Sequence, residues 1–233
     1  MRLIVVVMSL VLMSISSWAG TFRDDFEDGD WDGWTAVATL TWDTNVADRV
    51  SVVDGVLRLD HYDTPGYTLA LSIDEDWRDY SFSADMRLVK TEPGAPGLGG
   101  GISSRVEALD SYGSYYIHGA ISSWYAACEA KSKVSSDVWL IALPGNPWIG
   151  EWHRLRIDSV GNDISYYVDG ELQHQAKDDL HSSGGVNLYA YNAIVEFDNV
   201  IITGDDVPDG GPGGYTNIQA KVRLATNWGK LKR

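Results

Sequence analysis

The sequence of 233 residues contains a single cysteine, Cys128. One cysteine cannot form a disulfide within the chain, so the fold must be stabilised by a hydrophobic core rather than by covalent cross-links. Cys128 lies in the segment WYAACEAK, in the same alternation as Ala126 and Ala130. This position predicts a small buried side chain and not a nucleophile.

Basic residues are scarce in the body of the chain. Residues 20–205 contain 31 acidic and 12 basic residues. A surface this acidic repels phosphate groups, which argues against binding of nucleic acid. It is compatible with neutral glycans, with cation binding, or simply with solubility.

Long apolar runs are absent except at the N-terminus. Arg2 is followed by an apolar run over residues 3–15 and by Ser17-Trp18-Ala19, the pattern of a secretory signal. The run is too short for a membrane-spanning helix. We therefore expect residues 1–19 to be a signal peptide and the mature protein to be secreted or extracytoplasmic, without a transmembrane segment. The alternative is a buried strand or an anchor.

Helical periodicity is nearly absent between the signal and Asp205. The chain is instead a succession of short segments with apolar residues at alternate positions, such as YTLALSI, WHRLRID, ISYYVDG and VNLYAY. Gly, Pro, Asn or Asp residues bound each of them, which is typical of antiparallel strands joined by turns. The spacing predicts one all-β, two-sheet antiparallel sandwich over residues 20–205 and not two domains.

The composition changes at the C-terminal end. Residues 206–215 are rich in Gly, Pro and Asp, which predicts a flexible linker that does not pack. Residues 216–233 carry five basic residues and no acidic one. Their apolar residues recur at spacings of three and four, as in a basic amphipathic helix, although AKVRLAT could equally form a strand. We expect either a frayed tail or an element that attaches the protein to a surface or a partner.

Several segments occur in an order that resembles concanavalin A-like jelly rolls. They are FRDDFEDGDWDGW, VVDGVLRLD, WRDYSFSADMRL with GGGISSR, GEWHRLRI, ISYYVDGEL, SSGGVNLYAY and VEFDNVIITG. The sequence is most similar to laminin G-like bacterial domains, including levan-type carbohydrate-binding modules and 3-keto-disaccharide hydrolases. The resemblance implies a jelly-roll sandwich that meets glycans on its concave face or rim. It also implies that the first and last strands are adjacent, near a frequent structural calcium site. The fold does not define the activity, because it hosts lectins, hydrolases, lyases and spacers.

Paired carboxylates lie near both ends of the domain. Asp25 and Glu27 are two positions apart, as are Glu196 and Asp198, so each pair projects from one face of a strand. If the terminal strands are adjacent, these four residues offer the hard oxygen ligands that calcium prefers. We expect a structural calcium here. An acidic face that serves only solubility is the alternative.

Aromatic side chains with a polar group are abundant. Twelve Tyr and ten Trp stand against four Phe. Rings of this kind can stack on the C–H face of a sugar and hydrogen-bond at their edge, although sandwich cores also use them.

Alternation in the middle segments predicts a ligand-binding surface. If Ile102, Ser104 and Val106 face the core, Arg105 and Glu107 face outward. The same argument applied to SYYIHGAI, WYAACEAK and VNLYAY completes the candidate set, which is Arg105, Glu107, Tyr116, His118, Tyr125, Glu129, Tyr189 and Tyr191. These residue types can hydrogen-bond to and stack on a sugar. A polar face whose charges pair with one another is the alternative.

Catalysis by this surface has weaker support. Related glucanases carry the motif Glu-x-Asp-x-(x)-Glu on one strand, and the corresponding residues 196–200 lack the final Glu. Glu107 and Glu129 could still pair across strands as a glycosidase requires. Arg105, His118 and Tyr116 supply the residue types of a β-elimination lyase. We therefore predict a lectin-like module that binds a polysaccharide or other glycan, with a hydrolase or lyase and a non-catalytic adhesion or spacer domain as alternatives.

Overall fold

The computed structural model describes residues 19–38, 45–62, 68–91, 99–108, 115–122, 126–131, 136–141 and 149–211, with the backbone alone from 108 to 148. Within these ranges the chain consists of β-strands and one short 3-10 turn, η1 (Val46–Arg49). Among the described residues, no helix is long and apolar enough to cross a membrane. Residues 1–18 of the predicted signal and the predicted tail lie outside the described residues.

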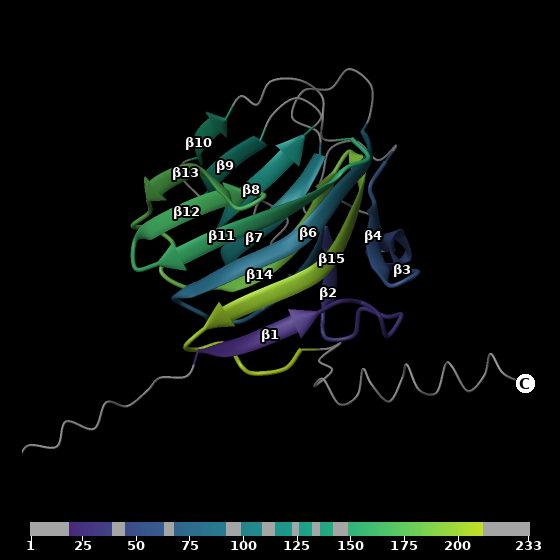
Figure 1. Ribbon diagram of the computed structural model, residues 1–233, viewed down its shortest axis with the longest axis horizontal. Coiled ribbons are helices and arrows are strands. Elements are labelled where there is room, and N and C mark those ends of the chain that lie inside the picture. The colour runs from purple at the N-terminus through teal and green to yellow at the C-terminus, as the bar shows by residue number, and fades with distance from the viewer. Residues whose placement is uncertain are drawn as a thin grey trace, which may run out of the picture.

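The strands form two antiparallel sheets that pack face to face (Figure 1). The eight-stranded sheet has the order β13 (Glu171–Lys177), β12 (Asp163–Val168), β11 (Trp152–Val160), β6 (Tyr80–Thr91), β15 (Ala193–Gly204), β4 (Val56–Asp60) and β3 (Val50–Val53), with β1 (Gly20–Asp24) also paired to β15. The seven-stranded sheet has the order β10 (Ser136–Ile141), β9 (Ala126–Lys131), β8 (Tyr115–Ser122), β7 (Gly99–Ala108), β14 (Gly185–Tyr191), β5 (Thr68–Ile73) and β2 (Thr35–Ala38). This architecture confirms the predicted two-sheet antiparallel jelly-roll sandwich.

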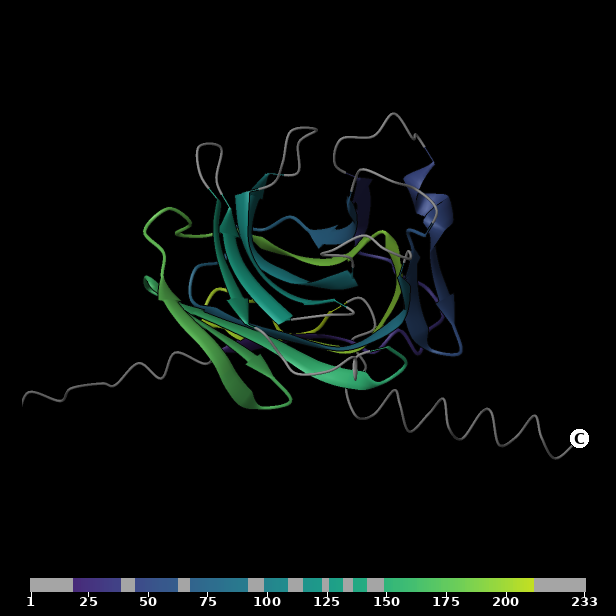
Figure 2. The same ribbon diagram turned by 90° about the horizontal axis from the view of Figure 1, so that it is seen from above.

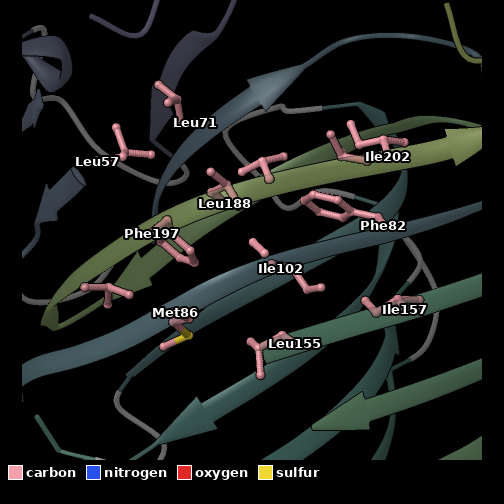
Figure 3. Packing of buried hydrophobic residues seen from close by; sticks show 14 of the residues in the cluster. Leu57, Leu71, Phe82, Met86, Ile102, Leu155, Ile157, Leu188, Phe197 and Ile202 are labelled. Carbon is pink, nitrogen blue, oxygen red and sulfur yellow. The ribbon is translucent and has the colours of Figure 1, made fainter. Parts of the chain in front are cut away.

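The core lies between the two sheets. Leu71 and Leu188 enter it from the seven-stranded sheet, and Phe82, Leu155 and Phe197 enter it from the eight-stranded sheet (Figure 3). All five side chains are fully buried. Burial of each such side chain contributes about 1.5–3 kcal/mol relative to exposure, so a core of this size holds the fold together without a disulfide.

The first and last strands are neighbours, as the sequence resemblance implied. β1 pairs with β15 over its whole length, from Gly20 opposite Gly204 to Asp24 opposite Val200.

The segment after β15 corrects the prediction of a linker at residues 206–215. Val207 is buried in the core. The backbone of Gly210 accepts a hydrogen bond from the Arg23 amide and donates one to the Thr21 carbonyl. Residues 206–211 therefore pack against β1 as part of the domain. Their Pro and Gly residues do not prevent Val207 from being buried or the backbone groups of Gly210 from forming hydrogen bonds. Residues 212–215 lie outside the described residues.

The seven-stranded sheet is bent, with the eight-stranded sheet along its outer side (Figure 2). Its outer, convex side faces the core and is covered by the eight-stranded sheet. Its other face forms a concave surface, which we call the trough. Because side chains alternate across a strand, the residues that alternate with the core residues Leu69 and Leu71 of β5 and Leu188 of β14 face the trough.

Candidate functional site

The trough is built from the polar positions of otherwise apolar strands. Leu69 and Leu71 of β5 are fully buried in the core, which directs Thr68, Ala70 and Ser72 to the opposite face. Likewise, Leu188 of β14 enters the core, so Asn187, Tyr189 and Tyr191 face the trough. The placement of Tyr189 and Tyr191 away from the core agrees with the alternation in the sequence.

Strand register arranges the trough in transverse rows. One row is largely polar and passes through Thr35, Ser72, Asn187, Ser103, His118 and Glu129. The next row consists of Val37, Ala70, Tyr189, Gly101, Ala120 and Ala127. Hydrogen-bonding positions thus run beside a row that is mostly small residues and contains one tyrosine.

A buried polar pair lies in the polar row. The Ser72 hydroxyl donates a hydrogen bond to Oδ1 of Asn187, and the two residues are only 2% and 4% exposed. This bond fixes the amide, whose Nδ2 group then remains as a donor. Polar side chains that contribute nothing to the core, held in defined orientations on a concave face, are typical of ligand-binding sites.

A cavity opens at one end of the trough. Its volume is about 390 Å³, and it is lined by Thr35, Val37, Ser72, Ile73, Asp74, Val106 and Glu107. Ligand sites typically have volumes of 300–1,000 Å³, so this cavity has room for one or two sugar rings. Of the predicted set, Glu107 lies here and is exposed.

Arg105 does not face the trough, which corrects the prediction for this residue. Its side chain is 1% exposed. It is the extra residue of a β-bulge, because the partner residues Gly185 and Val186 pair with Val106 and Ser104. Its φ of 51° lies in the left-handed region, and a bulge of this kind interrupts the alternation of the strand.

Hydrogen bonds from distant segments hold the Arg105 side chain. The guanidinium donates to the Arg78 carbonyl at 3.0 and 3.2 Å, to the His181 carbonyl at 2.8 Å and to Asp79 at 3.5 Å. Its backbone N–H donates to the Tyr80 hydroxyl at 2.6 Å. Burial lowers the pKa of Arg105, and Tyr80 and Asp79 oppose that shift. Arg105 is therefore a structural residue.

The bulge has a direct effect on the cavity. In a regular strand, Val106 would face the core together with Ser104. The extra residue instead turns Val106 into the lining of the cavity, where it lies beside Glu107. Arg105 thus affects the shape of the cavity through the bulge, although its side chain does not line the cavity.

The remaining members of the predicted surface have mixed outcomes. Tyr189 is 7% exposed and Tyr191 is partly exposed. The backbone register pairs His118 with Ser103 and with Glu129, so these positions share the polar row. Tyr116 belongs to β8 and pairs with Lys131. Tyr125 lies outside the described residues.

Ser72, Asn187 and Asp74 were missed in the sequence. A signal for the first two was present, because each is a polar residue between two aliphatic residues of an apolar strand, in LALSI and VNLYA. Asp74 follows directly after β5, and no local pattern distinguishes it from the other surface carboxylates.

A family model for the 3-keto-alpha-glucoside-1,2-lyase-like domain matches residues 21–203. The chain belongs to this family. The match runs from the second residue of β1 to the penultimate residue of β15 and confirms the resemblance to 3-keto-disaccharide hydrolase domains. No curated protein sequence matches the chain.

Solved structures share the fold of this 3-keto-alpha-glucoside-1,2-lyase-like domain. The carbohydrate-binding module CBM66 from Bacillus subtilis is 18% identical, with a TM-score of 0.52 over 72% of this chain and 93% of that one. A β-glucanase from Bacillus licheniformis is 14% identical, with a TM-score of 0.58 over 79% and 98% of the two chains. The catalytic domain of a laminarinase from Thermotoga petrophila is 14% identical, with a TM-score of 0.60 over 82% and 99%. At these identities the likeness establishes the concanavalin A-like jelly-roll fold.

The predicted calcium ligands of this lyase-like domain do not form one site. Oε1 of Glu196 accepts a hydrogen bond from Arg58 at 3.1 Å, and Oε2 accepts two from Arg87, one at 2.8 Å. Both oxygens are therefore occupied by guanidinium groups, and Glu196 does not fit a calcium site.

The other three carboxylates lie near one another. Burial raises the pKa of Asp198, and the negative charges of Asp85, Glu27 and Asp25 raise it further. Even so, in the part of the chain that the structure describes, no group of three or more His, Cys, Asp or Glu residues is placed to hold a metal ion. The four-residue set thus does not fit the ion, and calcium binding stays a prediction from the sequence.

Asp24, which sequence reasoning passed over, is the buried carboxylate at this end of the lyase-like domain. It is 2% exposed and accepts hydrogen bonds from the Trp34 indole at 2.8 Å and the Phe26 amide at 3.0 Å. Burial raises the pKa of Asp24 to about 6, against the opposing effect of these two hydrogen bonds. Asp24 therefore anchors the turn after β1.

Proposed function

We propose that this protein binds a glycan in the trough of its seven-stranded sheet. The observation that carries the proposal is the polar row that ends at the cavity, with the Ser72–Asn187 pair beside Thr35 and Glu107. These groups offer both donors and acceptors to sugar hydroxyls. The partly exposed ring of Tyr191 offers an apolar surface for the C–H face of a sugar.

The comparisons support the same class of ligand. The family is described by its relation to a glucoside lyase, and the similar solved structures are a carbohydrate-binding module and glucanases. From the sequence alone we extend the proposal to export directed by the N-terminal segment and to attachment to a surface or partner through the basic C-terminal tail.

A second candidate function is a 1,2-elimination on a 3-keto-glucoside, which the family description favours. In such a reaction a base removes the C2 proton, which the C3 ketone makes acidic. The C1–O bond then breaks, a C1=C2 double bond forms, and the leaving oxygen takes up a proton. Glu107 at the cavity is the base that this candidate requires, and His118 and Glu129 occupy the polar row beyond it. Arg105 cannot neutralise a bound uronate, because its guanidinium is buried and donates to the His181 carbonyl. The hypothesis of a polyuronate lyase, which required an exposed Arg105, therefore loses its support.

One experiment separates the two candidates. The purified chain is titrated calorimetrically with laminarin, lichenan and levan, and incubated with a 3-keto-glucoside while absorbance of the conjugated enone and released aglycone are recorded. Binding without products supports the binding module. Products that disappear in Glu107→Gln establish the elimination instead.

The variant Asn187→Ala tests the site itself. It removes the amide from the trough, and we expect glycan affinity to fall about tenfold, the loss of one or two hydrogen bonds to sugar. Glu171→Gln, on the edge strand β13 of the other sheet, is the matched control and should bind as the unmodified chain does. Near-ultraviolet circular dichroism establishes that both variants are folded. Full affinity in folded Asn187→Ala would refute the trough as the binding surface.

A further inference from the structure

Two carboxylates meet at the cavity from different parts of the chain. Glu107 lies near the end of β7, and Asp74 follows β5. Both side chains are exposed and line the same cavity. Over the residues whose side chains are described, neither has a hydrogen-bond or ion-pair partner. Their negative charges are thus directed at whatever occupies the cavity.

The described lining of the cavity contains no Lys, Arg or His that could compensate these charges. Arg105 is two residues from Glu107, but its guanidinium is turned inward to the carbonyls of Arg78 and His181. The bulge thus turns the positive charge of Arg105 away from the cavity and leaves Glu107 at the site.

The negative charge continues beyond the cavity. A second depression of about 380 Å³ shares Ile73 with the first and is lined by Asp32 and Glu75, together with Phe22 and Trp77. A glycan that extends from the cavity in this direction meets further carboxylates.

We infer that the site takes glycans that are uncharged or carry a protonated amine, and that Asp74 and Glu107 are the residues that exclude carboxylated and sulfated glycans. This inference rests on the proposed function and specifies its ligand class.

The size of the discrimination follows from Coulomb's law. Two carboxylates, each about 4 Å from one ligand carboxylate in water, lower the affinity for that ligand about tenfold or more. Because salt screens exposed charges, the discrimination should shrink as ionic strength rises.

The test uses matched pairs of probes and the full chain. Binding is measured for laminarin and lichenan, for the same polysaccharides after oxidation of C6 to carboxylate, and for levan, chitosan oligosaccharides, alginate and chondroitin sulfate. We expect every bound probe to be neutral or amine-bearing. We also expect an oxidised derivative to bind at least tenfold more weakly than its parent at low salt, with a smaller ratio in molar sodium chloride.

The double variant Asp74→Asn, Glu107→Gln then identifies the residues. The affinity ratio of a neutral probe to an anionic one should fall about tenfold in this variant, whatever the absolute affinities, and should stay unchanged in Glu171→Gln. Binding of anionic probes as tight as that of neutral ones, or an unchanged ratio in the folded double variant, overturns the inference and leaves glycan binding intact. Binding of no probe at all refutes the proposed function, and the inference with it.

Discussion

Replacement of Arg105 by alanine should destabilise the protein rather than only weaken its binding. The guanidinium is 1% exposed, and its loss leaves the carbonyls of Arg78 and His181 without their donors. Each buried polar group left unsatisfied costs about 1–3 kcal/mol. The cavity left by the side chain adds to this cost. We expect a decrease in the free energy of unfolding of about 3–5 kcal/mol, which lowers the Tm of a domain of this size by about 10 °C.

The assay is urea unfolding of the purified chain, followed by tryptophan fluorescence and checked by thermal unfolding. Arg105→Gly is the informative comparison, because it loses the same hydrogen bonds but relieves the left-handed backbone at φ 51°. Gly should therefore be more stable than Ala by about 1 kcal/mol. An Arg105→Ala protein as stable as the unmodified chain, yet unable to bind glycan, would refute this reasoning and restore Arg105 as an exposed ligand-binding residue.

Two further predictions concern the end of the domain where β1 meets β15. Because the pKa of Asp24 in the folded protein is raised to about 6 from 3.8, its contribution to stability is fully present below pH 4 and is lost as the pH rises through 6. Asp24→Asn should remove a pH-dependent loss of up to about 3 kcal/mol between pH 4 and pH 7, measured by urea unfolding at both pH values; an identical pH dependence in the variant would contradict the raised pKa. Since the residues around Glu196 do not fit a calcium site, EDTA or millimolar calcium should change the Tm by less than about 1 °C. A rise of several degrees with calcium would show that Asp25, Glu27 and Asp198 bind the ion.

Local alternation was sufficient to predict much of the fold and part of the site. Segments such as VNLYAY carry their own inside–outside pattern, so the strands, the sandwich and the outward positions of Tyr189 and Tyr191 follow from neighbouring residues. Glu107 was also placed at the surface by this reasoning.

The errors have a common physical cause. The bulge at Arg105 is stabilised by Tyr80 and His181, which are distant in sequence, so no local signal marks the residue at which alternation fails. The same holds for Glu196, which is paired by Arg58 and Arg87 from two other strands. Val207 becomes part of the core only because residues 206–211 return to β1. Contacts between residues that are distant in the sequence decided all three cases, and local sequence patterns do not reveal such contacts.

The position of β15 determines when this chain can fold. β15 pairs with β1, β4 and β6, so before it is synthesised the eight-stranded sheet exists only as separate pieces with apolar faces. The pairing of Gly20 with Gly204 spans nearly the whole domain, and such long-range pairing makes folding slow. The core therefore closes only after synthesis of the domain is complete. Until then Phe22 and the other core residues are exposed, which favours aggregation of the incomplete chain.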